Sequence, residues 1–424
     1  MYIIKRNGEK ALFDKEKIIN AINSAFVDVD GVLYETDTAE DIATEIELYI
    51  KYLDKEITVE DIQNKVEDYL MRSERKDVAR SYIRYRYKKE VARNYSDDFL
   101  KAISEKLNAS NVQNQNANVD EYSFGGRTGE ATEYLTKRYA LDFCVSPMAK
   151  ENHENNIIYI HDLGAYAVGM HNCLSIPFDD LLAKGFNTRQ TDVRPANSVN
   201  TAFQLVAVIF QLQSLQQFGG VSATHLDWTM VPYVRKSFGK HYKDGLKYIA
   251  NIEEENIDYE IHNMIKNSSN YSIEDSEWKA YNDLVYKYAI DMIIKEIQQA
   301  VEGMYHNLNT LQSRSGNQLP FTSINYGTCT LPEGRMIIRA LLEGSLKGTG
   351  KLRKTSIFPC GIFQLMSGVN KEPGTPNYDL KQLALKSTAT RLYPNYANVD
   401  WSGNAGYDVN DPTTYFSTIN KTVA

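Results

Sequence analysis

The residues with the clearest chemical potential lie in the stretch 156–177, where His171, Asn172 and Cys173 follow one another. An apolar run of strand length, 157–160, precedes them, and a Leu-Ser-Ile run follows the cysteine directly. A thiol between an amide and this apolar run could meet a substrate at a strand end. A buried cysteine without chemistry is the alternative, because free cysteine is among the most often buried residue types. This stretch alone favours a buried structural cysteine. Motifs elsewhere in the chain are needed to choose between the two interpretations.

Composition limits the class of protein. The 424 residues are 42% hydrophobic and 24% charged, which is typical of a soluble globular protein with two or three domains. The net charge of −8 argues against a sequence-independent nucleic-acid binder, which needs a basic face. No segment approaches the roughly 20 apolar residues of a membrane span, and the N-terminus lacks a signal peptide pattern. We therefore expect a cytoplasmic protein that binds neither nucleic acid nor membrane.

The cysteines are too scattered for a metal or disulfide motif. There are four, Cys144, Cys173, Cys329 and Cys360, and no C-x-x-C pair occurs. That pattern excludes a zinc ribbon and a redox dithiol motif, and we predict no metal site in this chain. Any cysteine with a role acts singly or meets another across the fold.

Residues 1–95 are predicted to form a separate small domain. Short apolar stretches at 2–5 and 10–13 flank Asn7-Gly8, a strong two-residue hairpin signal. Four helices should follow the hairpin, at about 14–26, 39–53, 58–70 and 77–91. Asp14 and Thr58 are the expected N-caps of the first and third of these helices, with Asp61 three residues after Thr58.

Basic residues of this domain could hold a polyphosphate. Lys5, Arg6 and Lys17 lie beside the hairpin and the first helix, and the fourth helix is rich in arginine and lysine. Charge-assisted hydrogen bonds from such side chains suit phosphate oxygens. The alternative, a solvated surface charge, holds for most single basic residues.

The pieces of this domain resemble a known family. Tyr-Ile-Ile-Lys-Arg-Asn-Gly at 2–8, Phe-Asp-x-x-Lys-Ile at 13–18 and Thr-Val-Glu-Asp-Ile at 58–62 resemble the ATP-cone, the regulatory nucleotide-binding domain of ribonucleotide reductases. The resemblance implies ATP and dATP as allosteric effectors. By position it assigns Lys5, Arg6, Asn7 and Lys17 to nucleotide binding, with Thr58 and Lys88 as weaker assignments.

Residues 96–424 have the pattern of an α/β domain. Ser198 to Gly219 is apolar over most of a helix circumference, which indicates a buried helix or one in a subunit interface. A glycine-rich turn is predicted at 123–129 and a long amphipathic helix at 278–311. His225 is predicted to be a hydrogen-bonded structural histidine, because no second histidine lies at metal spacing.

The last hundred residues alternate between strands and helices. Strands are predicted at 320–327, 356–365 and 393–399, with helices at 335–346 and 379–392 between them. This order is typical of an α/β barrel or a doubly wound sheet. Asn325, Gln364 and Asn398 are candidate polar groups at the carboxyl ends of those strands.

A second resemblance covers about residues 95–418. Its motifs are Ile-His-Asp-Leu at 160–163, His-Asn-Cys-Leu at 171–174, the segment 217–228 from Gln-Phe-Gly-Gly to Leu-Asp-Trp, Ser-Arg-Ser-Gly-x-Gln-x-Pro-Phe-Thr-Ser-Ile-Asn at 313–325, and Leu-Tyr-Pro-Asn-Tyr at 392–396. Together they resemble the anaerobic (class III) ribonucleoside-triphosphate reductase. The resemblance implies a ten-stranded α/β barrel of the glycyl-radical-enzyme type, acting as a homodimer, with a radical installed by an S-adenosylmethionine activase that carries an iron–sulfur cluster.

The family chemistry gives the lone thiol a role. In the family, a thiyl radical takes the 3′ hydrogen of a ribonucleoside triphosphate, the 2′-hydroxyl leaves as water, and a second cysteine supplies a hydrogen to C2′. Cys173 matches the second cysteine, and Asn172 beside it would orient the substrate. Formate or a small dithiol protein is the reductant in different branches, and the residues do not decide between them.

The end of the sequence departs from the family. After Thr414-Tyr-Phe-Ser-Thr418 the family continues Met-Gly-Cys-Arg, whose cysteine forms the thiyl radical, whereas this sequence reads Ile-Asn-Lys-Thr-Val-Ala at 419–424. That cysteine, the four-cysteine zinc site and the glycyl-radical loop have no counterpart here. We therefore expect the N-terminal part of a reductase, inactive alone, or a protein completed by a second chain.

Two other functions fit the sequence less well. A non-catalytic nucleotide-binding partner could regulate a full-length reductase through the apolar helix at 202–215. An unrelated α/β enzyme could use Cys173 as a nucleophile with His171 as its base. Two residues along an extended chain is a poor geometry for such a pair, which disfavours this last reading.

Overall fold

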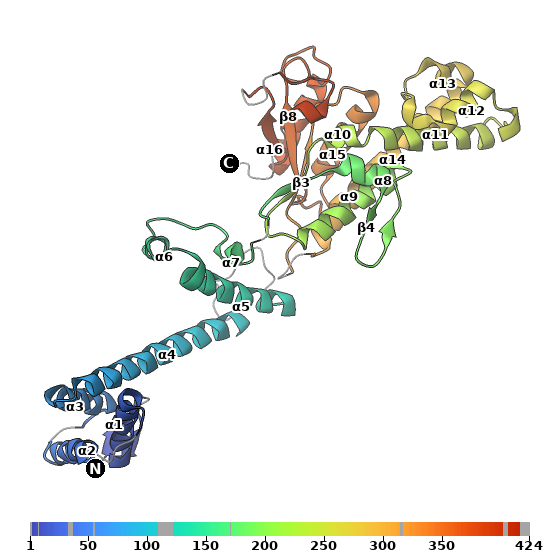
Figure 1. Cartoon of the computed structure of the whole chain (residues 1–424). Helices are drawn as coiled ribbons and strands as arrows, with labels where there is room; N and C mark the ends of the chain where they lie inside the picture. The colour runs from blue at the N-terminus through green and yellow to red at the C-terminus, as the bar shows by residue number, and fades with distance from the viewer. Residues whose placement is uncertain are drawn as a thin grey trace. The chain divides into compact units, whose positions relative to one another are not determined.

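The computed structural model divides into two compact units, Met1–Glu105 and Lys106–Ala424. We describe each unit by itself (Figure 1). The structure describes residues 2–6, 8–32, 37–53, 56–108, 122–169, 171–313, 317–401 and 406–415.

The first unit is a hairpin followed by four helices, as predicted. Its elements are β1 (Tyr2–Ile4), β2 (Lys10–Leu12), α1 (Lys15–Asp30), α2 (Asp37–Lys51), α3 (Val59–Arg72) and α4 (Lys76–Asn108). The strands pair antiparallel with Tyr2 opposite Leu12, and Gly8 takes a positive φ of 82° in the turn. The fourth helix continues to Asn108, well beyond the predicted end at 91.

The two predicted helix caps are confirmed. The Asp14 carboxylate accepts a hydrogen bond from the Glu16 backbone N–H at 3.2 Å. Thr58 and Asp61 form a complete capping box, with the Asp61 N–H donating to the Thr58 hydroxyl at 3.1 Å. The helices enclose one apolar core in which Ile22, Ile46 and Leu70 have no exposed surface.

The second unit combines many helices with a parallel sheet. Its α-helices are α5 (Phe124–Tyr139), α6 (Pro147–Glu154), α7 (Leu163–Tyr166), α8 (Phe178–Lys184), α9 (Val199–Ser214), α10 (Leu226–Thr229), α11 (Val231–Tyr248), α12 (Tyr259–Lys266), α13 (Ser276–Tyr281), α14 (Asp283–Thr310), α15 (Pro332–Lys347) and α16 (Tyr378–Arg391). Its strands are β3 (Leu174–Ile176), β4 (Phe186–Asn187), β5 (Asp192–Val193), β6 (Val221–Ala223), β7 (Thr322–Tyr326), β8 (Cys360–Leu365) and β9 (Asn395–Asn398).

Five of these strands form one parallel sheet in the order β3-β6-β7-β8-β9. The predicted strands β7, β8 and β9 therefore lie side by side, and helices connect each to the next (Figure 1). The α/β fold class is confirmed. The pair β4-β5 makes a separate two-stranded hairpin.

The apolar core of this unit packs on one face of the sheet. Ile176, Val221, Ile324 and Phe363 from four strands belong to the same buried cluster as helices α9, α11 and α14. Helix α9 buries Phe203 and Phe210 completely, so the prediction of a buried helix is confirmed. No helix in the described part of the chain is long and apolar enough to cross a membrane.

Three local predictions were wrong. Residues 157–160 form no strand, because the N–H groups of Ile157 and Ile158 both donate to the Asn152 carbonyl and fold the chain into a turn after α6. The glycine-rich segment is the first turns of α5, since the Ser123 hydroxyl caps that helix. The predicted helix 278–311 breaks at Asn282, whose side chain caps α14.

Candidate functional site

The Asn172-Cys173 pair lies immediately before β3, at the amino end of the parallel sheet. The thiol is half-buried, whereas Asn172 is exposed. The Cys173 Sγ donates to the Asn172 Oδ1 at 3.3 Å and accepts the Gly220 backbone N–H at 3.2 Å. The sulfur is thus tied to two neighbours without being sealed from its surroundings.

The segment 217–220 holds this pair in place. The Gln217 side-chain amide donates to the Asn172 carbonyl at 3.3 Å and to the Gly220 carbonyl at 2.8 Å. A side chain at position 219 has no room, because a Cβ there would lie 1.9 Å from the Asn172 carbonyl oxygen. The motifs at 171–174 and 217–220, far apart in the sequence, therefore meet at one place.

The thiol faces the polar side of the sheet. The register places Ser175, Ser222, Ser323 and Cys360 in one row across four strands. Side chains two residues apart along a strand share a face, so Cys173 is on the same face as this row. The other face carries the apolar residues of the core. The sheet therefore has one mostly apolar side and one side on which hydroxyl, thiol and amide groups predominate.

The middle of the polar row is buried and internally hydrogen-bonded. Ser323 donates to the Ser222 hydroxyl at 3.0 Å, and the Asn325 amide donates to the same hydroxyl at 3.2 Å. Ser222, Ser323 and Asn325 have no exposed surface. These contacts fix the orientation of Asn325, one of the predicted polar groups.

The other two predicted groups lie differently. Asn325 pairs with Ile362 of β8 and shares its face. Gln364 is two residues after Ile362 on the same strand, so it lies on that face as well. Asn398 pairs with Leu365 and is on the opposite face. The structure thus brings Asn325 and Gln364 to one side, toward the carboxyl ends of their strands, and leaves Asn398 out.

The remaining cysteines differ from Cys173 in environment. Burial raises the pKa of the Cys360 thiol, which lies 3.7 Å from the Tyr393 hydroxyl. Burial also raises the pKa of Cys329, which packs against Gly334. Cys144 is exposed on the segment after α5. Protonated, buried thiols are poor nucleophiles, so Cys329 and Cys360 are structural by this criterion.

His225 is the structural residue that was predicted. Its Nδ1 lies 2.8 Å from the Thr224 hydroxyl and its Nε2 lies 2.7 Å from an Asp179 oxygen. Both ring nitrogens are therefore occupied, and the residue orients the β6–α10 corner.

Sequence reasoning missed the clamp made by Asp227. This fully buried carboxylate accepts the backbone N–H groups of Gly327, Thr328 and Cys329 at 2.9 to 3.1 Å. Burial raises the pKa of Asp227, and the backbone N–H groups of Cys329 and Gly327 are the main contacts that partly offset that effect. The clamp fixes the turn after β7, whose Thr328 hydroxyl pairs with the Tyr415 hydroxyl at 2.7 Å.

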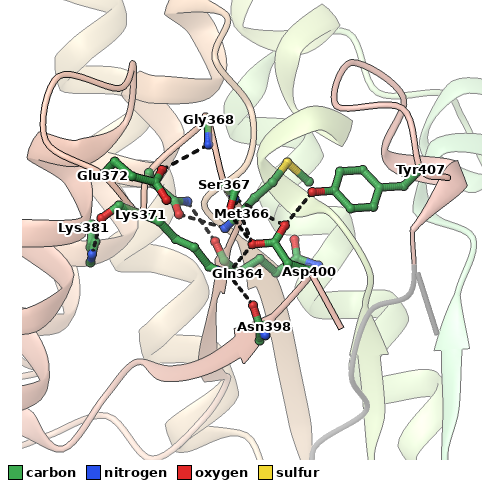
Figure 2. Close-up of polar contacts among 11 residues, drawn as sticks. Gln364, Met366, Ser367, Gly368, Lys371, Glu372, Lys381, Asn398, Asp400 and Tyr407 are labelled. Carbon is green, nitrogen blue, oxygen red and sulfur yellow. Dashed lines mark hydrogen bonds and ion pairs between the residues drawn. The ribbon is translucent and has the colours of Figure 1, made fainter. Parts of the chain in front are cut away.

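A second polar network, also missed, lies at the carboxyl ends of β8 and β9. Figure 2 shows Asp400 in contact with Lys371, Ser367 and Tyr407. Burial opposes ionisation of Asp400, but these hydrogen bonds outweigh it and lower the pKa to about 2. Lys371 also donates to the Asn398 Oδ1 at 2.6 Å. Asn398 therefore belongs to this network and not to the polar row.

In the first unit, three of the predicted nucleotide-binding residues lie together. The Ile4 N–H donates to the Ile57 carbonyl at 2.9 Å, and this contact brings Lys5, Arg6 and Thr58 to one edge. The Thr58 hydroxyl is engaged in the capping box, and Lys5 lies 3.5 Å from Glu9.

The positions of the other predicted nucleotide-binding residues give no support for a shared site. Lys17 lies 3.6 Å from Asp14 in the first turn of α1, and Lys88 is exposed on α4. Asn7 lies outside the described residues.

Comparison with known proteins assigns both units. The family model for the anaerobic ribonucleoside-triphosphate reductase matches residues 115–413, and that for the ATP cone domain matches residues 1–91. The chain belongs to the anaerobic ribonucleoside-triphosphate reductase family. Within this family, the chain is 31% identical to the reductase of Haemophilus influenzae over 403 residues and 29% identical to that of Escherichia coli over 405 residues.

The chain spans about half the length of the curated relatives it matches. Each match covers 94% of this chain, but 52% of the Haemophilus influenzae reductase and 51% of the Escherichia coli reductase. The anaerobic ribonucleotide reductase of Thermotoga maritima, solved with dATP and CTP, matches at a TM-score of 0.45 and 14% identity, over 75% of this chain and 50% of that one.

We predict that Gly219→Ala displaces Asn172 and Cys173. The new methyl group collides with the Asn172 carbonyl, which should cost about 1–3 kcal/mol of folding free energy and loosen the Gly220 contact to the thiol. Thermal unfolding and the rate of Cys173 alkylation by iodoacetamide, followed by peptide mass spectrometry, report both effects. Gly303→Ala is the matched control, because a Cβ there meets no atom within 4 Å. Equal behaviour of the two variants would contradict the packing argument.

We also predict an acid-dependent contribution from Asp400. Its folded-state pKa of about 2 lies below the ordinary value of 3.8, so the ionised group stabilises the fold above that value and loses this effect as the pH falls toward 2. Asp400→Asn should cost about 1–2 kcal/mol at pH 6, and clearly less near pH 3. Urea unfolding at both pH values measures this. Asp180→Asn, which removes an exposed carboxylate bonded to Lys184, should cost under about 0.5 kcal/mol at either pH. A pH-independent Asp400→Asn effect would refute the assignment.

Proposed function

We propose that this chain contributes the effector-binding domain and one substrate-facing sheet of an enzyme that reduces ribonucleoside triphosphates to 2′-deoxyribonucleoside triphosphates. The observation that carries the proposal is the convergence of Gln217 and Gly219–Gly220 on Asn172-Cys173, within a chain that matches a reductase of this family over 94% of its length. The parallel sheet is proposed to be part of the ten-stranded barrel of that family.

In the proposed reaction, a radical supplied by the complete enzyme removes the 3′ hydrogen of the ribose. The 2′-hydroxyl then takes up a proton and leaves as water, and Cys173 gives the hydrogen atom of its thiol to C2′. A reductant, formate or a dithiol, supplies the two electrons that restore the Cys173 thiol and complete the reduction of the sugar, and the 3′ hydrogen returns to C3′. Asn172, exposed beside the sulfur, donates or accepts hydrogen bonds to the sugar hydroxyls. Ser175, half-buried on the same face, offers a further hydroxyl group to the substrate, and the buried Ser222 beside it supports that face.

The first unit is proposed to bind ATP and dATP. Lys5, Arg6 and Thr58 lie at one edge of this unit, and the family match over residues 1–91 supports an effector site there. Asn7, Lys17 and Lys88 are proposed to complete it. For the assembly we propose a homodimer through α9, which exposes Leu212 and Leu215, and an activase that supplies the radical.

Calorimetric titration tests the effector site. We expect ATP and dATP to bind the chain, and Lys5→Ala to weaken binding about ten-fold through the loss of one charge-assisted phosphate contact. Lys184→Ala, which removes a lysine of the second unit paired with Asp180, should leave affinity unchanged. Absence of adenine-nucleotide binding by the unmodified chain would exclude the effector site.

Protection of Cys173 tests the substrate site independently. A ribonucleoside triphosphate seated against the thiol should slow its alkylation several-fold. Cys144, exposed and remote in sequence, serves as an internal control and should react at the same rate with and without nucleotide. Peptide mass spectrometry reads both rates in one sample. Equal protection of both thiols, or of neither at saturating nucleotide, would contradict a ribose site at Cys173.

A further inference from the structure

Arg6, a predicted phosphate-binding residue, is already engaged by an acidic side chain. Its Nε forms an ion pair with one oxygen of Glu60, and its Nη2 donates to the Gln63 Oε1 at 2.8 Å. The other oxygen of Glu60 accepts from the Arg86 Nη2 at 2.6 Å. One carboxylate therefore bridges two guanidinium groups.

The three bridged residues come from three different elements. Arg6 follows β1, Glu60 is in the first turn of α3, and Arg86 is on α4. The Arg86 side chain is 14% exposed and has further contacts at 2.8 Å with Glu67 and Asn64. The Glu60 side chain is 45% exposed, so it can turn toward solvent while Arg86 stays in place.

The bridge has the form of an anion site that is filled from within. Burial favours a raised pKa of Glu60, but the hydrogen bonds and charges of Arg6 and Arg86 together outweigh it and lower the pKa, so the carboxylate is charged at neutral pH. Two arginines facing one pair of oxygens is the arrangement that binds phosphate as well as carboxylate.

The charge balance explains why the bridge matters for a nucleotide. Arg6 and Arg86 carry two positive charges, and Glu60 and Glu67 carry two negative ones, so the cluster is neutral while Glu60 remains. When Glu60 turns away, a net positive charge remains for a polyphosphate. A ligand with more phosphate charge replaces the carboxylate more readily.

We propose that nucleotide phosphates take the place of the Glu60 carboxylate between Arg6 and Arg86, so that Arg86 is a phosphate-binding residue and Glu60 an internal competitor. This inference rests on the proposed binding of ATP and dATP by the first unit. In this proposal Glu60 sets the affinity for the nucleotide, and therefore the concentration range over which the effector acts.

The test compares two charge-matched variants by ATP calorimetry on the full chain. Glu60→Gln removes the competing charge and should tighten ATP binding about three- to ten-fold, the range expected for the loss of exposed ion pairs. Glu56→Gln removes the same charge from an ion pair with Lys10 that touches neither arginine, and should change affinity less than about two-fold. Arg86→Met should weaken binding about ten-fold or more, with folding checked by thermal unfolding.

The outcomes separate this inference from the proposed function. Tighter binding by Glu60→Gln than by the wild type, with Glu56→Gln unchanged, supports the inference. Wild-type binding that Glu60→Gln leaves unchanged or weakens, or that Glu56→Gln tightens equally, overturns the inference and leaves the effector site standing. No ATP binding by the wild type overturns both.

Discussion

The close approach of Gly219 to Asn172 is the constraint on which the candidate site depends. The two residues are 47 positions apart in the sequence, yet their backbones approach so closely that no methyl group fits between them. The Gln217 amide then joins the carbonyls of Asn172 and Gly220, so β3 and β6 begin at the same level, with Leu174 opposite Val221. A larger residue at 219 would separate the strands at the point where the thiol sits.

The same constraint decides which way the thiol faces. Once β3 and β6 are in register, alternation along the strands puts Cys173 on the side of Ser222, Ser323 and Asn325, and sends Ile176 and Val221 into the helical core. A shift by one residue would exchange the two sides and bury the thiol among apolar groups. Ser222, Ser323 and Asn325 can be buried because they are hydrogen-bonded to one another.

Much of the fold could be predicted from local sequence. The hairpin, the caps at Asp14 and Thr58 and the strands after Pro320 depend on near neighbours, and each is confirmed. The apolar run at 157–160 has the composition of a strand, but it forms none. The turn found there depends on backbone hydrogen bonds to Asn152, which the composition of the run does not indicate. The strand β6 was missed because three residues give too little pattern.

The site was predictable in part. Family motifs pointed to Asn172 and Cys173, whose roles as reacting residues stay predictions, but no sequence pattern indicates that Gly219 is packed against them. The bridge from Arg6 through Glu60 to Arg86 was also missed, because charges 54 and 26 residues apart read as ordinary surface groups. Such contacts arise only when separate elements pack together.

Amide-resolved hydrogen exchange at Gly220 tests the central claim most directly. We expect the Gly220 N–H to be protected by its bond to the Cys173 sulfur and to exchange markedly faster in Cys173→Ala, while Cys144→Ala leaves it unchanged. Equal exchange in the wild type and in Cys173→Ala would contradict the claim that the glycine pair holds the thiol.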